Sequence, residues 1–312
     1  MAHTHSHDHH HGHNHGHSHA PKDFNRAFAI GVTLNVGFVL IEIVFGWLSN
    51  SLALLADAGH NFSDVLALLL AWGASVLVQK RPTQRHTYGL RRTSVLAALT
   101  NALILLVAVG AIAWEAIHRF DHPESVESGT VILVAAVGIL INGFTAYLFM
   151  ADKAQDVNIR GAYLHMAADT AVSLGVVIAA IAMRFTGWLW LDSVTSLAIA
   201  IVIGVGTWSL LRESLNLALD AVPESIDPSK VKTYLDNLPG VTAVHDLHIW
   251  AMSTTEIALT VHLIKPDAVI DDALLARINS ELREQFGIQH TTVQFESGDT
   301  DHQCKQAPAD AV

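Results

Sequence analysis

Cysteine is almost absent from this sequence of 312 residues, since Cys304 is the only one. A single cysteine excludes an intrachain disulfide framework. Charged residues are also scarce, at 15%, and the formal net charge of −11 argues against nucleic acid as a partner. Residues 1–20 contain no apolar run of the kind found in a signal peptide.

Hydrophobic residues, by contrast, make up 51% of the chain. The mean hydropathy of +0.36 is high for a soluble protein and low for a purely intramembrane one. We therefore expect a six-helix transmembrane domain over residues 26–212 and a water-soluble domain over residues 213–296. Each of six apolar segments has close to the ~20 residues needed to span a bilayer. They are Ala27–Trp47, Leu52–Val78, Val95–Ile117, Thr130–Met150, Ala162–Met183 and Trp190–Leu211.

Basic residues concentrate in alternate loops. The loop after the second segment and the loop after the fourth carry Lys80, Arg81, Arg85, Arg91, Arg92, Lys153 and Arg160. The positive-inside rule then puts both termini in the cytoplasm. We expect an integral membrane protein of the cell (inner) membrane.

Two of the apolar segments each carry a histidine and an aspartate four residues apart. The pairs are His60 with Asp64 and His165 with Asp169. Positions i and i+4 share one face of a helix, so two such helices can supply two nitrogen and two oxygen ligands. Four ligands in tetrahedral geometry suit zinc, which predicts an intramembrane divalent-metal site and hence a metal transporter. The alternative is an interhelical hydrogen-bond cluster that holds the bundle together. Counting along the helices places the two pairs at different depths, an offset that the sequence leaves open.

Other polar residues lie within the spans, and structural hydrogen bonding explains most of them. Glu42 and Asp57 are the better functional candidates, as carboxylates that line a water-filled approach.

The N-terminal tail, residues 1–25, is rich in histidine. Ten of the 20 histidines in the chain lie between His3 and His19. This composition cannot form a core, so we expect a disordered cytoplasmic tail that collects metal, because imidazole binds zinc, copper and nickel. A purification tag is the alternative.

After Arg212, prolines and charges become frequent. The pattern predicts helix, strand, strand, helix, strand, which is an α+β domain with an antiparallel sheet. Asp227 is a candidate N-cap for a helix over Pro228–Leu238. Residues 297–312 are expected to form a disordered tail.

Potential metal ligands gather on the expected strands. A cytoplasmic regulatory site could use His245, His248, His262 and Glu296, although a regular strand places His245 and His248 on opposite faces. His290 lies beside the last strand. His86, in the basic loop, is a weaker candidate, and so are His302 and Cys304 because they belong to the tail.

Taken together, these residues resemble the cation diffusion facilitator family, and most closely its bacterial zinc and cadmium efflux members. The match covers about Arg26–Glu296, and its specific marks are Ser51–His60 with Asp64, Gly161–His165 with Asp169, and His245–Trp250. The resemblance implies six transmembrane helices, a ferredoxin-like (metallochaperone-like) cytoplasmic domain, a homodimer and metal–proton exchange. It also implies that His60, Asp64, His165 and Asp169 form the transport site, in the two-His, two-Asp combination of zinc-selective members.

The predicted function is therefore export of divalent metal, zinc first and cadmium or other divalent cations next, by metal/proton antiport with alternating access. A metal sensor or storage protein is one alternative, suggested by the His-rich tail. An intramembrane zinc hydrolase is another, but no His-Glu-x-x-His motif is present and four protein ligands leave no open position for water. We do not expect an enzyme.

Overall fold

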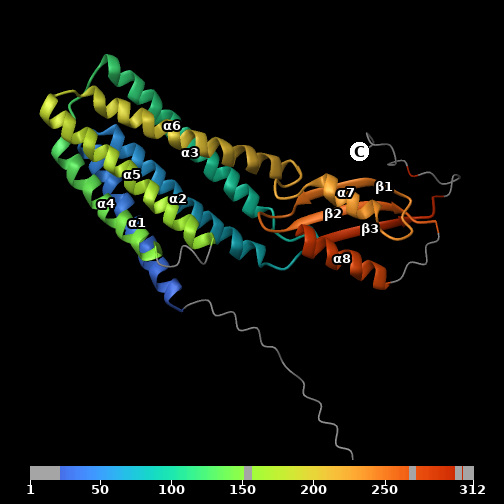
Figure 1. The fold of residues 1–312 in the computed structure, drawn as a ribbon. Coiled ribbons are helices and arrows are strands. Elements are labelled where there is room, and N and C mark those ends of the chain that lie inside the picture. The colour runs from blue at the N-terminus through green and yellow to red at the C-terminus, as the bar shows by residue number, and fades with distance from the viewer. Residues whose placement is uncertain (1–21, 151–156, 267–271, 299–303, 305–312) are drawn as a thin grey trace, which may run out of the picture.

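The computed structural model describes residues 22–150, 157–266, 272–298 and 304. Six long helices lie side by side in one bundle, and a small α/β domain lies beyond one end of it (Figure 1). The predicted helical segments are all confirmed as helices. Their observed bounds are α1 Lys22–Leu48, α2 Leu52–Val78, α3 Thr93–Asp121, α4 Ser128–Met150, α5 Val157–Thr186 and α6 Trp190–Ala218.

Four stretches of these helices are long and apolar enough to cross a membrane among the described residues. They are Thr93–Asp121, Ser128–Tyr147, Tyr163–Thr186 and Trp190–Ala218. A bilayer cannot hydrogen-bond a free backbone, so helices that satisfy their own backbone groups are the expected solution for such sequences. The protein is thus an integral membrane protein with at least these four apolar spans.

Close helix packing builds the core of the bundle. Phe38 of α1, Leu54 of α2, Val131 of α4 and Val176 of α5 are buried in one cluster. A Cβ atom at Gly138 would lie only 2.6 Å from Phe38 Cζ, so glycine at this position lets α1 approach α4. In lipid there is no hydrophobic driving force between helices, so they associate through close van der Waals packing, which small residues allow.

Asp192 ties the start of α6 to the start of α2. Its carboxylate accepts hydrogen bonds from Ser51 Oγ at 2.6 Å and from the backbone N–H of Leu52 at 2.7 Å. A carboxylate at a helix N-terminus satisfies backbone donors that have no partner inside the helix. This contact sets the position of α2, which carries half of the candidate site.

The α/β domain contains α7 Pro228–Asp236, β1 Ala243–Ala251, β2 Ile257–Ile264, α8 Asp272–Phe286 and β3 His290–Glu296. The side chain of Asp227 accepts a hydrogen bond from the Ser229 N–H, so the predicted N-cap is confirmed. Leu235 and Leu282 of the two helices and Leu259 of β2 share one buried core with the rest of the sheet. The helices therefore cover one face of the sheet and leave the other face available.

The expected antiparallel sheet is wrong. The strand order is β1-β2-β3, with β1 antiparallel to β2 but β2 parallel to β3. Two parallel neighbours need a crossover connection, and α8 provides it. The order α-β-β-α-β lacks, among the described residues, the first strand of the ferredoxin-like pattern, so the structure supports only the broader description of a small domain with a mixed sheet.

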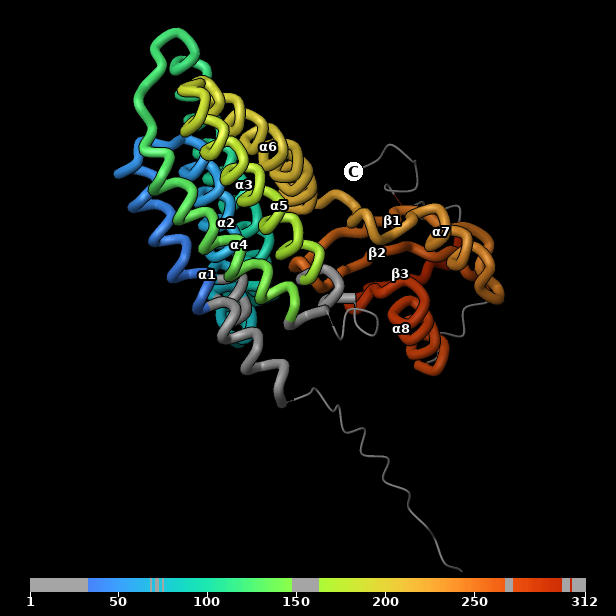
Figure 2. The backbone as a smooth tube through the Cα atoms, turned by 60° about the vertical axis from the view of Figure 1, so that its left-hand side comes forward, coloured from blue at the N-terminus to red at the C-terminus, as the bar shows by residue number. Residues whose placement is uncertain are grey.

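The loop between α2 and α3 contacts the α/β domain, which follows the end of α6 in Figure 2. Arg91 forms an ion pair with Glu256, between β1 and β2, and Arg92 forms one with Asp220, after α6. The Thr254 N–H donates to Ser94 Oγ at 3.1 Å. The start of α3 is therefore linked directly to the α/β domain.

Candidate metal centres

The four predicted intramembrane ligands meet in the structure. His60 and Asp64 project from α2, and His165 and Asp169 project from α5. His60 Nε2 lies 3.3 Å from Asp169 Oδ1, and His165 Nε2 lies 3.2 Å from Asp64 Oδ2. Within each helix the distances are longer: His60 lies 3.9 Å from Asp64, and His165 lies 3.6 Å from Asp169. Each histidine is thus closer to the aspartate of the other helix than to that of its own.

This crossed arrangement answers the question of depth. Counting residues along the helices placed the two His-Asp pairs at different depths, but in the structure they lie side by side. One ligand atom each from His60, His165 and Asp169 lie within 4.8 Å of one another. Asp64 completes the set through its contact with His165, and we call these four residues the membrane cluster.

The membrane cluster combines a buried base with more accessible partners. The Asp169 side chain is 2% exposed, whereas His165 is 39% and Asp64 38% exposed. A cavity of about 510 Å³ lies beside the cluster, between α2, α3, α5 and α6. It is lined by His60, Asp64 and Asp169 together with polar Ser63, Asn101 and Thr207 and several small apolar residues. Three of the four residues of the membrane cluster therefore border an open space inside the bundle.

Glu42 and Asp57 do not line this cavity. Both are completely buried, with 0% of their surface exposed. The expectation that they line a water-filled approach is wrong, because each points into the contact between helices and is hydrogen-bonded there by a neighbouring side chain.

A second group of ligands lies on the uncovered face of the sheet. His245 of β1 pairs with His262 of β2, but His248 pairs with Thr260, so β1 contains a bulge between the two histidines. A bulge adds one residue to a strand and shifts its alternation. His245 and His248 consequently share a face, contrary to the expectation for a regular strand.

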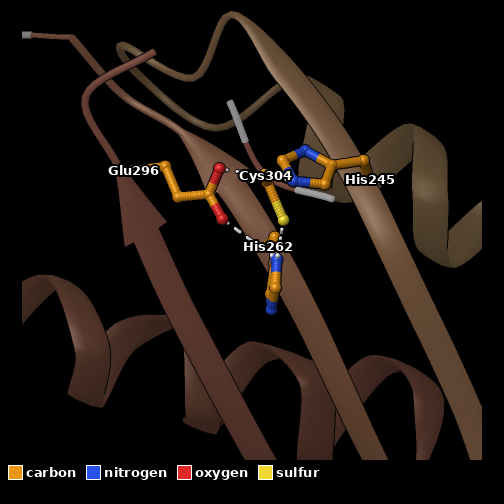
Figure 3. Close-up of side chains that lie close together, drawn as sticks. All are labelled: His245, His262, Glu296 and Cys304. Atoms are coloured by element: carbon orange, nitrogen blue, oxygen red, sulfur yellow. Dashed lines mark hydrogen bonds and ion pairs between the residues drawn. The ribbon is translucent and has the colours of Figure 1, made fainter. Parts of the chain in front are cut away.

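Four side chains converge there, as Figure 3 shows: His245, His262, Glu296 and Cys304. Glu296 Oε1 lies 3.0 Å from His262 Nδ1, and Glu296 Oε2 lies 3.4 Å from His245 Nε2. Cys304 Sγ lies 3.5 Å from His262 Nδ1. The four ligand atoms lie within 4.8 Å of one another, and we call these residues the sheet cluster.

The remaining candidates lie elsewhere. His248 is exposed and contacts Asp246 at 2.9 Å rather than the sheet cluster. Asp246 also lies 3.4 Å from His262, a contact that the sequence reasoning missed, and its φ of 49° shows why strand alternation could not predict it. His86 is exposed in the α2–α3 loop, and no group of three ligand residues includes it among the described residues. His290 contacts Tyr88 edge-to-face, with the ring centroids 5.5 Å apart, and His302 lies outside the described residues.

The helix bundle holds an internal set of two histidines and two aspartates and carries an attached α/β domain. This arrangement is typical of a membrane protein that binds metal ions. Comparison with known proteins agrees with this class. Residues 28–217 match the cation efflux transmembrane domain, and residues 223–298 match the cytoplasmic domain of cation efflux proteins. The chain belongs to the cation efflux family, also called the cation diffusion facilitators, and the resemblance found in the sequence is confirmed.

Curated relatives match over nearly their whole length. The chain is 39% identical to the zinc transporter ZitB of Escherichia coli, over 95% of this chain and 93% of the relative. It is 36% identical to the metal cation efflux system protein CzcD of Cupriavidus metallidurans, over 93% and 90%. It is 34% identical to a cadmium, cobalt and zinc/H(+)-K(+) antiporter of Bacillus subtilis, over 89% and 90%. The family consists of transporters, so the prediction that the chain is not an enzyme is confirmed and the hydrolase alternative is excluded.

Among solved structures, the metal-bound C-terminal domain of the CzcD transporter is 38% identical in sequence. The match covers 23% of this chain and 99% of the solved domain, with a TM-score of 0.22.

Proposed function

We propose that this protein exports divalent metal ions, with zinc as its preferred ion, in exchange for protons. The observation that carries the proposal is the crossed contact of the two His-Asp pairs within the bundle. Two imidazoles and two carboxylates match the ligand number and ligand types of zinc. The names of the relatives, which include a zinc transporter and a cadmium, cobalt and zinc antiporter, support the same cargo.

Proton exchange follows from the chemistry of the ligands. Zinc binds only neutral histidine and ionised aspartate, so metal ions and protons compete for the membrane cluster. Histidine, with an ordinary pKa of about 6.5, can exchange one for the other near neutral pH. Alternating access would expose the membrane cluster first to the cytoplasm and then to the outside.

The proposal includes a topology. α1 to α6 would all span the membrane, with both termini and the α/β domain in the cytoplasm, as the basic loops favour. The domains would be residues 26–212 in the membrane and 213–296 in the cytoplasm, with tails over 1–25 and 297–312. The match to the cytoplasmic domain of cation efflux proteins and the family resemblance support a homodimer.

Flux measurements test the function directly. Proteoliposomes that contain the full chain should accumulate zinc while protons move in the opposite direction. Asp169→Ala should lower zinc flux at least about tenfold, equivalent to about 1.4 kcal/mol, because it removes the most buried ligand. Asp121→Ala, at an exposed position at the end of α3, is the matched control. Unchanged flux in Asp169→Ala would refute the site assignment, and metal binding without flux in the wild type would favour the sensor or storage alternative.

We also propose a regulatory role for metal binding at the sheet cluster. Two nitrogens, one oxygen and one sulfur suit zinc or cadmium. Cys304 would take the place expected for His248 in the predicted ligand set. Because this cluster lies in the domain that contacts the start of α3, metal bound there can influence the membrane helices.

A further inference from the structure

Glu42 of α1 and Asp57 of α2 face each other inside the bundle, outside the membrane cluster and its cavity. Both residues are 0% exposed. The two carboxyl groups are near enough for the charge of each to act on the other. Neither residue belongs to any group of metal ligands found among the described residues.

The protein supplies one donor to each carboxyl group. Asn61 Nδ2 donates to Glu42 Oε2 at 2.9 Å, and Ser173 Oγ donates to Asp57 Oδ2 at 2.9 Å. The second oxygens, Glu42 Oε1 and Asp57 Oδ1, have no donor among the described residues. A buried carboxylate oxygen without a donor is costly, and two adjacent carboxylates cannot both stay ionised in a site of low dielectric constant.

One proton removes both difficulties. It converts the contact between the two acceptors into an O–H···O hydrogen bond and halves the buried charge. A metal cation is a poorer occupant. The pair offers only two free oxygens, whereas Asn61 and Ser173 present hydrogens, and hard cations require six or more oxygen ligands.

The surroundings connect this pair to the membrane cluster. Asn61 follows the ligand His60 in α2, and Ser173 lies one turn after the ligand Asp169 in α5. Of the membrane cluster, Asp169 acts electrostatically on both carboxyl groups, and His60 acts on Asp57. The helix α4, which packs against α1, contains no acidic or basic residue. A change of charge in the membrane cluster therefore changes the electrostatic field at Glu42 and Asp57.

We propose that Glu42 and Asp57 form a proton-binding site that holds one shared proton while the membrane cluster is empty and releases it when a divalent cation binds there. The arriving cation offsets the negative charge of Asp169, which removes part of the penalty for a second carboxylate nearby. An O–H bond of the pair breaks, and the proton passes to water when the alternating-access motion opens the bundle, because both carboxyl groups are 0% exposed in this structure. This inference rests on the proposed function, and it adds a proton carrier that is not a metal ligand.

Infrared difference spectroscopy on the purified full chain tests the proposal without requiring flux. Zinc addition should remove a carbonyl-stretch band of a protonated carboxylic acid in the wild type. The band should shift in D₂O and should be missing in Glu42→Gln. A pH-indicator dye should report one fewer proton released per zinc in that variant. Glu127→Gln, at an exposed position before α4, is the matched control and should behave as wild type.

Asp57→Asn provides the second variant if Glu42→Gln does not fold, and it should lose the same band. A band that persists in both variants, or a wild-type spectrum unchanged by zinc although zinc binds, would overturn the proposal. Failure of the proposed function looks different. In that case Asp169→Asn would bind zinc as tightly as the wild type, whatever happens at the carboxyl pair.

Discussion

His60 of α2 lies closer to Asp169 of α5, at 3.3 Å, than to Asp64 one turn along its own helix, at 3.9 Å. Each helix therefore completes the ligand pair of the other. The four side chains stay together only while the two helices keep their relative position. Under the proposed function, a conformational change that shifts one helix against the other would therefore alter metal affinity.

The first prediction concerns metal selectivity. His60→Asp replaces a nitrogen ligand with an oxygen, and carboxylates favour harder or larger cations over zinc. We expect the ratio of manganese or cadmium flux to zinc flux to rise in proteoliposomes that contain this variant. His118→Asp, at an exposed histidine near the end of α3, should keep the wild-type ratio. An unchanged ratio in His60→Asp would show that the imidazole does not select the ion.

The second prediction concerns pH. Zinc requires neutral imidazoles, so protonation competes with binding as pH falls, and the apparent zinc affinity should decrease between about pH 8 and about pH 5.5. Isothermal titration at several pH values measures the slope. Replacing His60 and His165 together with Gln should flatten the dependence as well as weaken binding. The same slope in this double variant and in the wild type would assign the titration to other groups.

The third prediction concerns Cys304. Its sulfur is the softest ligand of the sheet cluster, so Cys304→Ser should weaken cadmium binding there by about tenfold or more and zinc binding by less. The measurement should use the full chain without the histidines of residues 1–20 and with Asp169→Asn, so that the sheet cluster dominates. Cobalt bound in place of zinc should lose its thiolate charge-transfer absorption.

His248→Ala is the control for that experiment, because His248 contacts Asp246 and lies outside the sheet cluster. Equal loss of affinity in His248→Ala and Cys304→Ser would contradict the ligand set in Figure 3.

The fourth prediction concerns the junction between the domains. Arg91→Glu places two negative charges together at Glu256 and should make the α2–α3 loop more accessible to protease. The double variant Arg91→Glu with Glu256→Arg should restore protection. The pair is about one-third exposed on each side, so the expected coupling is no more than about 1 kcal/mol. Equal cleavage in the single and double variants would show that the ion pair does not hold the loop.

Local signals made much of this architecture predictable. Runs of about 20 apolar residues predicted α1 to α6 because a bilayer leaves few alternatives. The Asp227 N-cap and the two His-Asp pairs could also be predicted, because each depends only on residues within one turn of a helix. The direction of β3 was not readable, since strand pattern carries no information on whether neighbours run parallel or antiparallel. Nor was the bulge in β1, which brings His245 and His248 to one face.

The sequence by itself therefore determined which residues could bind metal and which segments would be helical, because residue chemistry and helical spacing are local properties. Only the tertiary structure decided how those residues combine. It crossed the pairs of α2 and α5, brought Cys304 to His262, and buried Glu42 against Asp57. These contacts join residues far apart in the chain, and the packing of whole helices and strands, rather than any local pattern, sets their distances.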